Sequence, residues 1–563
     1  MKKQICIYTL FAIGVIFLFS FWIGKIPLYS SDEGRYGEIA REMWENKNFV
    51  IPTFNYSSYL DKPILAPFLT ALSFSMFGIN EISVRLVPIL AAIFGILMTF
   101  LFTKIIFDRT IAHYAALLLL TTVGYVLVGR FGVIDMLMTF FLSGSMFCLM
   151  HAYFNRRTKY YLLAYAFMGF AFLTKGMIGF VLPGLIFLAF LTWTKNLKEI
   201  GKMHLVWGVL IVAVIILPWF VAACLKESEF FDIFIVKQQF TRFLKGGFGR
   251  RKPFWFFAPI LIATSFPWSL FLPATLINSF RKENPYQKAM KFLICWVGVI
   301  FIFFSLPKSK LPYYLLPASV PFAVLIAVFL ADWVHGKEAS RLVSVVMKWT
   351  WRVLFGICSL AVTGLFVYLL FWKQDPQTAT LRPVLQAVGV TVLAGSTLAY
   401  FFQRIDRRKN AVTALAGMIF ITLLVTFVGM KKIGPFQSSF AYAEVLNSKL
   451  QSGDMLAVYA SPDEFSDIPF YLKRRVVVVG PDKGTLTYEA DEPDHAEENK
   501  KWFISREQMV SIFNENQVRV YCLMEQDKFQ DLLNIGIKNY RILKEGFGKL
   551  LISNVSDEAQ KPF

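Results

Sequence analysis

The sequence predicts a polytopic α-helical membrane protein with a small soluble α/β domain at its C-terminal end. Of its 563 residues, 56% are hydrophobic and 17% are aromatic, and the mean hydropathy is +0.53. The apolar residues fall in long runs and not in the amphipathic stripes of soluble helices, which is typical of membrane spans. After Met430 the runs end and a mixed pattern of short apolar and polar stretches begins.

The long apolar runs define the membrane part. An α-helix needs roughly 20 mostly apolar residues to cross the hydrocarbon core. The first run follows Lys2 and Lys3 and is not followed by a small-residue cleavage site, so we expect a retained span and not a signal peptide. In total the sequence predicts about thirteen spans, near residues 5–24, 82–107, 111–129, 133–154, 160–174, 176–194, 203–224, 254–279, 290–306, 313–334, 351–373, 383–402 and 411–430.

The basic residues predict the orientation of these spans. Lys and Arg gather in alternate short loops, as in Arg156-Arg157 and Arg407-Arg408, which the positive-inside rule places in the cytoplasm. Loops 25–81, 225–253 and 307–312 then face the other side, together with the C-terminus. The formal charge of +20 is thereby explained without a nucleic-acid partner. Five of the six cysteines lie in apolar segments, so neither a disulfide framework nor a thiolate metal site is expected.

We therefore expect two domains, a membrane domain over 1–430 and a periplasmic α/β domain over 431–563. The second domain lacks a glycine-rich phosphate loop and a His/Cys cluster, which favours a role in docking or scaffolding and predicts no nucleotide cofactor. Its pattern predicts strands at Leu456–Ala460, Arg475–Val479 and Val518–Leu523, and helices at Phe440–Leu450, Arg506–Asn514 and Gln526–Leu533.

Acidic residues at the outward membrane surface are candidates for chemistry, because carboxylates near a bilayer are costly. Asp32 and Glu33 lie just beyond the first predicted span, and Asp135 begins the fourth span on the same side. One hypothesis is an acidic centre that orients an acceptor, takes its proton or holds a divalent metal such as Mg²⁺. The alternative is that Asp32 and Asp135 each cap a helix N-terminus.

Several cations lie on the outward side, against the positive-inside rule. Lys62 stands at the membrane surface beside Pro63, loop 225–253 carries Arg242 among other cations, and the short loop 307–312 holds Lys308 and Lys310. Fixed cations of this kind suit a lipid phosphate. The alternatives are a snorkelling Lys62 at a helix start and loop cations that pair with lipid headgroups or with acids of the same face.

Taken together, these segments resemble a known family. Several motifs occur in order: Asp32-Glu33-Gly34-Arg35-Tyr36 with Ile39-Ala40-Arg41-Glu42-Met43, Tyr59-Leu60-Asp61-Lys62-Pro63, Phe77-Gly78 with Arg85-Leu86, Phe172-Leu173-Thr174-Lys175-Gly176, and Phe304-Ser305-Leu306-Pro307-Lys308-Ser309-Lys310-Leu311-Pro312-Tyr313-Tyr314. They resemble the aminoarabinose lipid A transferases, which belong with the protein O-mannosyltransferases to the membrane glycosyltransferases of GT-C fold. The segment Gln238-Gln239-Phe240-Thr241-Arg242-Phe243 then looks like the outward-loop motif of that family. The resemblance implies transfer of 4-amino-4-deoxy-L-arabinose from undecaprenyl phosphate to lipid A, with inversion, at the periplasmic face of a bacterial inner membrane.

The resemblance also implies roles for individual residues. Asp32 and Asp135, with Glu33 beside them, would form the acidic catalytic centre and could hold Mg or Zn. The carrier phosphate would be bound by Lys62, Arg35, Tyr59, Arg242, Lys308 and Lys310. The cavity would be lined by Tyr36, Asp61, Tyr313 and Tyr314, with no choice made between the two last tyrosines.

Two other functions compete with this prediction. A related transferase could use another sugar or a protein or glycan acceptor, and the departure Gln238-Gln239, where family members often have Glu-His, bears on that choice. A flippase or transporter for a lipid-linked sugar would be expected to place charges near the bilayer midplane and to show repeated halves. Here the charged motifs gather at one face and no repeat is visible, which favours the enzyme.

Overall fold

The computed structural model describes residues 2–241, 252–281, 284–336, 340–371, 376–459, 461–487 and 496–555. The chain divides into two compact units, and each is assembled from separate stretches of sequence. The first unit comprises Met1–Ile23, Arg85–Leu225 and Phe234–Met430. The second comprises Gly24–Val84, Lys226–Ile233 and Lys431–Phe563.

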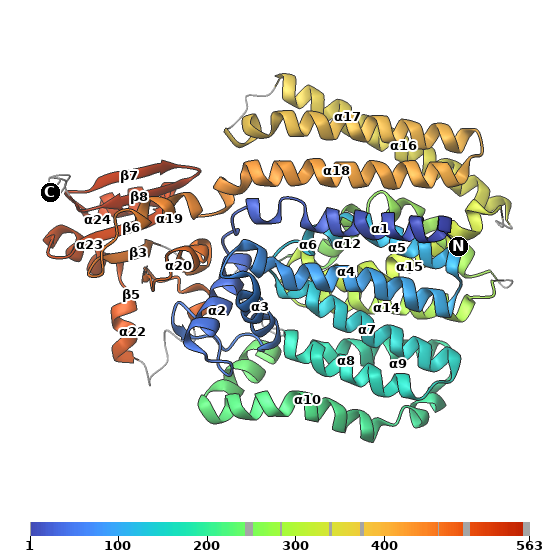
Figure 1. Ribbon diagram of the computed structural model, residues 1–563, viewed down its shortest axis with the longest axis horizontal. Helices are drawn as coiled ribbons and strands as arrows, with labels where there is room; N and C mark the ends of the chain where they lie inside the picture. Colours follow the sequence, from blue (N-terminus) through green and yellow to red (C-terminus); the bar gives the residue numbers. More distant parts are fainter. Residues whose placement is uncertain are drawn as a thin grey trace. The chain divides into compact units, whose positions relative to one another are not determined.

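The first unit is helical (Figure 1). Its long apolar segments form helices because every backbone polar group in a bilayer must find its hydrogen bond within the same segment. The helices are α1 (Lys2–Ser20), α4 (Glu81–Ile106), α5 (Arg109–Leu120), α6 (Val123–Val128), α7 (Ile134–Asn155), α8 (Lys159–Lys175), α9 (Ile178–Trp193), α10 (Leu205–Lys226), α12 (Phe257–Thr264), α13 (Leu272–Ser279), α14 (Gln287–Ser305), α15 (Ser319–Val334), α16 (Arg341–Phe371), α17 (Pro376–Arg404) and α18 (Arg408–Gln437).

Fewer helices pass a test of length and apolar composition than the thirteen spans predicted. Within the described part of the chain, nine helices are long and apolar enough to cross a membrane, or ten if Phe254–Thr264 and Trp268–Ser279, bent by 103°, form one span. The other predicted spans are helical but short. They correspond to α5 with 12 residues, α8 with 17 and α9 with 16.

Local backbone chemistry ends these short helices. The predicted span 111–129 is broken at Thr121 and Thr122, whose hydroxyls donate to the carbonyls of Leu117 and Leu118 and compete with the helix ladder. Helix α8 ends at Gly176, which adopts a φ of +81° that favours glycine. An apolar run therefore does not show where a turn divides it into shorter helices.

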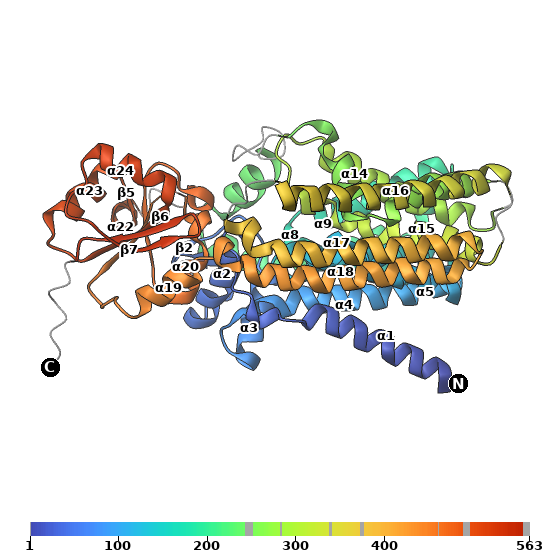
Figure 2. The same cartoon turned by 90° about the horizontal axis from the view of Figure 1, so that it is seen from above.

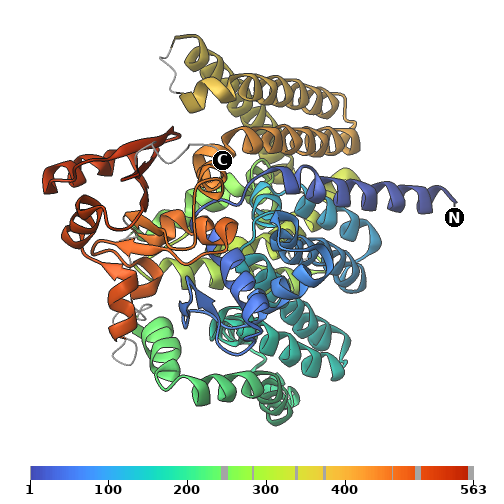
Figure 3. The same cartoon turned by 60° about the vertical axis from the view of Figure 1, so that its left-hand side comes forward.

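Helices α16, α17 and α18 run side by side in both views of Figures 1 and 2, and they stay together in Figure 3. Their close approach depends on glycines: a Cβ atom at Gly395 of α17 would lie 2.5 Å from Met418 of α18. With 31, 29 and 30 residues, each is longer than the roughly 20 residues that cross the hydrocarbon core. Their ends therefore extend into the headgroup region.

The second unit contains a six-stranded sheet with the order β5-β4-β3-β6-β8-β7. The first four strands in that order are parallel, and β8 and β7 are antiparallel. The strands are β3 (Met455–Tyr459), β4 (Val477–Val479), β5 (Phe503–Ile504), β6 (Val520–Glu525), β7 (Arg541–Gly546) and β8 (Lys549–Ser553). The helices around them are α19 (Phe440–Asn447), α20 (Asp467–Leu472), α22 (Ala496–Trp502), α23 (Arg506–Glu515) and α24 (Phe529–Ile535).

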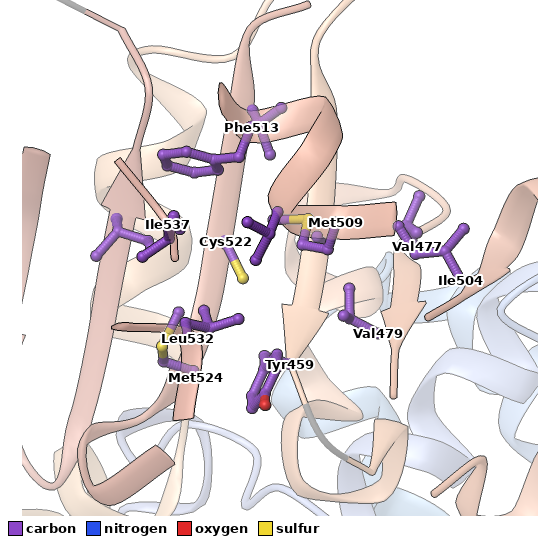
Figure 4. Close-up of a cluster of buried hydrophobic side chains, with 14 of the residues drawn as sticks. Tyr459, Val477, Val479, Ile504, Met509, Phe513, Cys522, Met524, Leu532 and Ile537 are labelled. Atoms are coloured by element: carbon purple, nitrogen blue, oxygen red, sulfur yellow. The ribbon is translucent and has the colours of Figure 1, made fainter. Parts of the chain in front are cut away.

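Both faces of this sheet are buried, which follows from side chains that alternate along each strand. On β6, Cys522 and Met524 point to one face, where α23 and α24 pack (Figure 4). Leu523 points to the other face, which α19 and α20 cover. The sequence-based prediction of a soluble α/β domain is therefore confirmed, while β5, β7 and β8 were not predicted.

The first outward loop belongs to this second unit. It contains α2 (Asp32–Asn46), a short hairpin of β1 (Thr53–Phe54) and β2 (Ser57–Ser58), and α3 (Leu65–Phe77). The predicted division into 1–430 and 431–563 had placed this loop with the membrane domain. In the structure this loop is joined to the C-terminal part of the second unit through Asp467. The fully buried Asp467 carboxylate accepts hydrogen bonds from Ser30, at the start of the loop, and from Ser438.

Candidate active site

The expected acidic centre is divided between the two units. Asp32, Glu33 and the carrier-binding candidate Lys62 belong to the second unit, whereas Asp135 belongs to the first. Each cluster is therefore described by itself.

The cluster in the second unit is built around Arg35. Its guanidinium donates to the carboxylate of Asp32, one turn earlier in α2, and to Oδ1 of Asp463 at 3.0 Å. The same Asp463 oxygen accepts a 2.8 Å hydrogen bond from Thr485. Burial lowers the pKa of Arg35, but Tyr59 and then the carboxylates of Asp32 and Asp463 together raise the pKa by more, so the guanidinium stays charged. Arg35 is thus held by two carboxylates that are 431 positions apart in the sequence.

The start of α2 is fixed by its packing against α20. A Cβ atom at Gly34 would lie 2.6 Å from the backbone nitrogen of Asp467, so only glycine fits at this close approach. Ser31 precedes the helix with a φ of +74°, a strained conformation for a residue with a side chain. The N-cap residue is Ser31 and not Asp32, so the Asp32 carboxylate serves the ion pair with Arg35. Its side chain keeps 23% of its surface exposed.

Tyr59, Asp61 and Lys62 follow the hairpin. Tyr59 is buried in an apolar cluster with Ile39 and Phe54, and burial raises the pKa of its hydroxyl well above the usual value. Tyr59 therefore stays protonated and is able to donate a hydrogen bond. Asp61 is buried, and Lys62, half-buried, donates to the Asp61 carbonyl at 3.0 Å.

Glu33 and Tyr36 complete the predicted residues of α2. The buried Glu33 carboxylate accepts a 2.9 Å hydrogen bond from the backbone of Tyr29. The Tyr36 ring lies 5.4 Å from the Arg35 guanidinium, within the range of a cation–π contact. Glu33 therefore holds the chain that leads into α2, and Tyr36 lies beside the central cation of the cluster.

The cluster in the first unit is centred on Lys175, which sequence analysis did not select. Lys175, the last residue of α8, donates to the carboxylate of Asp135 in the first turn of α7. Both side chains are buried, with 12% and 7% of their surface exposed. The residue before α7 is Val133, so Asp135 is not the N-cap. The signal for Lys175 was its place in the motif Phe172–Gly176, at the end of an apolar run.

Two other motif segments reach the same place in the first unit. The Tyr314 ring, in the 3₁₀ helix η6 (Pro312–Ala318), lies 4.6 Å from Nζ of Lys175. Gln239 lies in the π-helix η3 (Asp232–Thr241), and its side chain is so close that a Cβ atom at Gly176 would be 2.7 Å from its Nε2 atom. Of the two predicted tyrosines, Tyr314 contacts Lys175 of this ion pair, and the centre of the Tyr313 ring lies 5.7 Å from that of Tyr314.

The remaining predicted cations differ in exposure. Lys308 is exposed, whereas Lys310 is 3% exposed and donates to the carbonyls of Lys252 and Pro307. Burial lowers the pKa of Lys310. Arg242 lies outside the described residues. Among the described residues, no group of three or more His, Cys, Asp or Glu side chains could hold a metal ion; the metal expected at Asp32 and Asp135 stays a prediction.

Three buried charges lie further along α2. Arg41 donates two hydrogen bonds to Glu38, both at 2.6 Å, and a third to Glu45. Glu42 accepts from the backbone of Tyr56 at 3.0 Å. Glu38, Arg41 and Glu42 are fully buried. Burial and the repulsion of Glu38 raise the pKa of Glu42 well above its usual range.

This cluster predicts a pH-dependent stability that Glu42→Gln removes. A raised pKa in the folded state means that Glu42 stabilises the fold below its unfolded pKa of about 4.3, and that this contribution is lost as the pH rises through the folded value. We expect the wild-type melting temperature to fall over that window and the Glu42→Gln curve to be flatter. Thermal unfolding between about pH 5 and pH 9 measures this. Glu45→Gln, on the same helix but exposed, is the control and should keep the wild-type slope. An unchanged slope in Glu42→Gln would contradict the assignment.

Comparison with known proteins shows the class to which this fold belongs. The sequence model of a protein family, described as dolichyl-phosphate-mannose-protein mannosyltransferase, matches residues 61–221. A crystal structure of ArnT from Cupriavidus metallidurans bound to undecaprenyl phosphate has the same fold, with a TM-score of 0.83, 22% identity and 100% of each chain covered. The chain is thus a multi-pass membrane protein of GT-C glycosyltransferase fold.

Similar sequences narrow the family. An undecaprenyl phosphate-alpha-4-amino-4-deoxy-L-arabinose arabinosyl transferase of Shewanella sediminis is 27% identical over 86% of this chain and 88% of its own. A second such transferase, from Pseudomonas fluorescens, is 32% identical over 56% of this chain, and that match spans 54% of the relative's length, about half. Over most of its length the chain is thus similar to the aminoarabinose transferases, and it shares the fold of one of them.

Proposed function

We propose that the protein transfers 4-amino-4-deoxy-L-arabinose, or a closely related sugar, from undecaprenyl phosphate to a phosphate group of lipid A. The observation that carries the proposal is the similarity over 86% of the chain to a transferase named for this donor. The site would face the periplasm of a bacterial inner membrane, an orientation supported by the distribution of Lys and Arg.

The chemistry requires cations at the leaving group. Undecaprenyl phosphate leaves readily when fixed positive charges meet its developing negative charge. Lys62 and Arg35 of the second unit are candidates for that role, together with Arg242 and Lys308, whose positions in the motifs suggest it. Burial lowers the pKa of Lys310 and so disfavours its charged form. Lys310 would therefore stabilise the leaving phosphate less than Lys308.

The role of the acids depends on the acceptor. A phosphate acceptor is already a nucleophile, so Asp32 would position it or hold a metal ion. A hydroxyl acceptor would need a base, and Asp32 would then take the proton. The second candidate function, transfer to a protein, is favoured by the mannosyltransferase model that matches residues 61–221.

The test is a transfer assay with the purified full-length chain in liposomes. With undecaprenyl-phosphate aminoarabinose and lipid A, mass spectrometry should detect lipid A that carries the sugar. Lys62→Ala should lower the rate roughly 100-fold, because one fixed charge at a developing anion contributes about that much. Lys538→Ala, an exposed lysine of the same unit, is the matched control and should retain wild-type rates.

Two outcomes would overturn the proposal. Movement of the donor lipid between leaflets without formation of a glycosidic bond would indicate a transporter. Sugar found on added protein but not on lipid A would favour the mannosyltransferase-like alternative.

A further inference from the structure

A cavity of about 470 Å³ opens at one end of the helices α15, α16, α17 and α18 in the first unit. It is lined by four cations, Lys348, Arg352, Arg404 and Arg408, and by one carboxylate, Asp406. The lining of the cavity therefore carries a net charge of three positive charges. The function proposed above uses none of these residues.

One of the cations is fixed in place. Arg408 donates from Nε to Asp406 at 2.7 Å and from NH1 to the Trp333 carbonyl at 2.8 Å. Its guanidinium also lies 5.3 Å from the Trp333 ring, within the range of a cation–π contact. Asp406 is 79% exposed, so it screens Arg408 only weakly. Arg408 thus forms a rigid wall of the cavity.

The other three cations have no acidic partner in the part of the chain that the structure describes. Lys348 and Arg352 lie one turn apart on α16, and Arg404 is the last residue of α17. All three are exposed. Like charges gathered around one cavity repel one another, so an anion within the cavity would stabilise the arrangement.

The position of the cavity indicates which kind of anion would bind in it. The ends of α16 and α17 extend beyond the hydrocarbon core, and the apolar side chains just inside those ends, Trp349 and Phe401, are 58% and 54% exposed. An apolar surface of this kind suits acyl chains. Within the cavity, the aromatic Trp333 and Tyr400 accompany the cations, as at membrane interfaces. Basic pockets between membrane helices bind anionic headgroups.

We propose that this cavity binds the phosphate headgroup of an anionic glycerophospholipid, with the acyl chains along α16 and α17. Arg352 and Arg404 contact the phosphate, since a planar guanidinium can bind two phosphate oxygens at once. The loop that holds Arg408 carries the cationic excess that predicts a cytoplasmic position, so the lipid belongs to that leaflet.

The test uses native mass spectrometry of the full-length protein in detergent with phosphatidylglycerol, phosphatidylcholine or inorganic phosphate. We expect retained phosphatidylglycerol and little phosphatidylcholine. The double variant Arg352→Ala/Arg404→Ala should bind phosphatidylglycerol roughly tenfold or more weakly, because each surface cation contributes to the attraction of anionic lipid. The matched control is Arg407→Ala/Lys409→Ala, two exposed cations of the same loop that do not line the cavity, and it should bind as wild type does.

Three results would overturn the inference. Equal binding of phosphatidylglycerol and phosphatidylcholine would show that headgroup charge has no role. If the control variant lost as much phosphatidylglycerol binding as Arg352→Ala/Arg404→Ala, binding would depend on general surface charge and not on this cavity. Inorganic phosphate that displaces phosphatidylglycerol at equal concentration would show that the acyl chains contribute nothing. Melting temperatures of both double variants near the wild-type value establish that the comparison is made on folded protein.

Discussion

Replacing Asp32 with asparagine is expected to lower the rate of sugar transfer by about 10²–10⁴-fold, the range of a lost general base or a lost fixed charge. The asparagine keeps the size of the side chain and removes its charge. Because 23% of the Asp32 side chain is exposed and Arg35 keeps its ion pair with Asp463, the fold should survive. The measurement is kcat/KM in the liposome assay, with the melting temperature recorded for the same sample.

The comparison with Asp463→Asn separates two roles of Asp32. Both carboxylates bind Arg35, so each substitution takes one partner from that guanidinium. If Asp32 acts only by holding Arg35, the two variants should lose activity to a similar degree. If Asp32 acts on the substrate, Asp32→Asn should be far more damaging. Wild-type activity in Asp32→Asn would refute the acidic centre.

The second large effect is expected at the buried ion pair of Asp135 and Lys175. Either Asp135→Asn or Lys175→Met leaves one charge buried without its partner, which costs about 3–5 kcal/mol. We expect a lower melting temperature for both and a loss of transfer of roughly 100-fold or more for Asp135→Asn. Thermal unfolding and kcat together report the two effects.

A double variant distinguishes structure from chemistry at this pair. Asp135→Asn with Lys175→Met removes both charges, so most of the lost stability should return. Activity should stay low if the carboxylate or the ammonium acts on the substrate. Recovery of activity together with stability would mean that the pair is structural and that Asp135 has no part in catalysis.

The Lys175 contact with Tyr314 also gives the motifs of the first unit a common physical basis. Asp135, Lys175, Gln239 and Tyr314 come from four separate segments that meet around one ion pair. Gln239 is an uncharged side chain and belongs to the Gln238-Gln239 departure from the motif of the family that the sequence resembles. Because the Gln239 side chain lies against Gly176, a different group at position 239 would change the surroundings of the neighbouring Lys175.

Much of the fold followed from local pattern. The apolar runs predicted the helices because a bilayer requires long uninterrupted apolar segments. The short apolar runs Leu456–Ala460 and Val518–Leu523 predicted β3 and β6. The predicted boundaries were less accurate, since a run such as 111–129 does not reveal that the helix is interrupted at Thr121 and Thr122. Strands as short as β5, with two residues, carry too little pattern to be recognised.

The sequence by itself determined the class of the protein, the course of its membrane helices and the charged motifs proposed to carry its chemistry. Only the tertiary structure decided the partners of those charges, which are Asp463 for Arg35 and Lys175 for Asp135. It also decided that the first outward loop belongs to the same unit as the C-terminal sheet. The physical reason is that helices and strands are recognisable from residues close together in the sequence. A buried charge, in contrast, pairs with an opposite charge that the fold places within a few ångströms, however distant that residue is in the sequence. These pairs span 40 and 428 positions, beyond the reach of any local pattern.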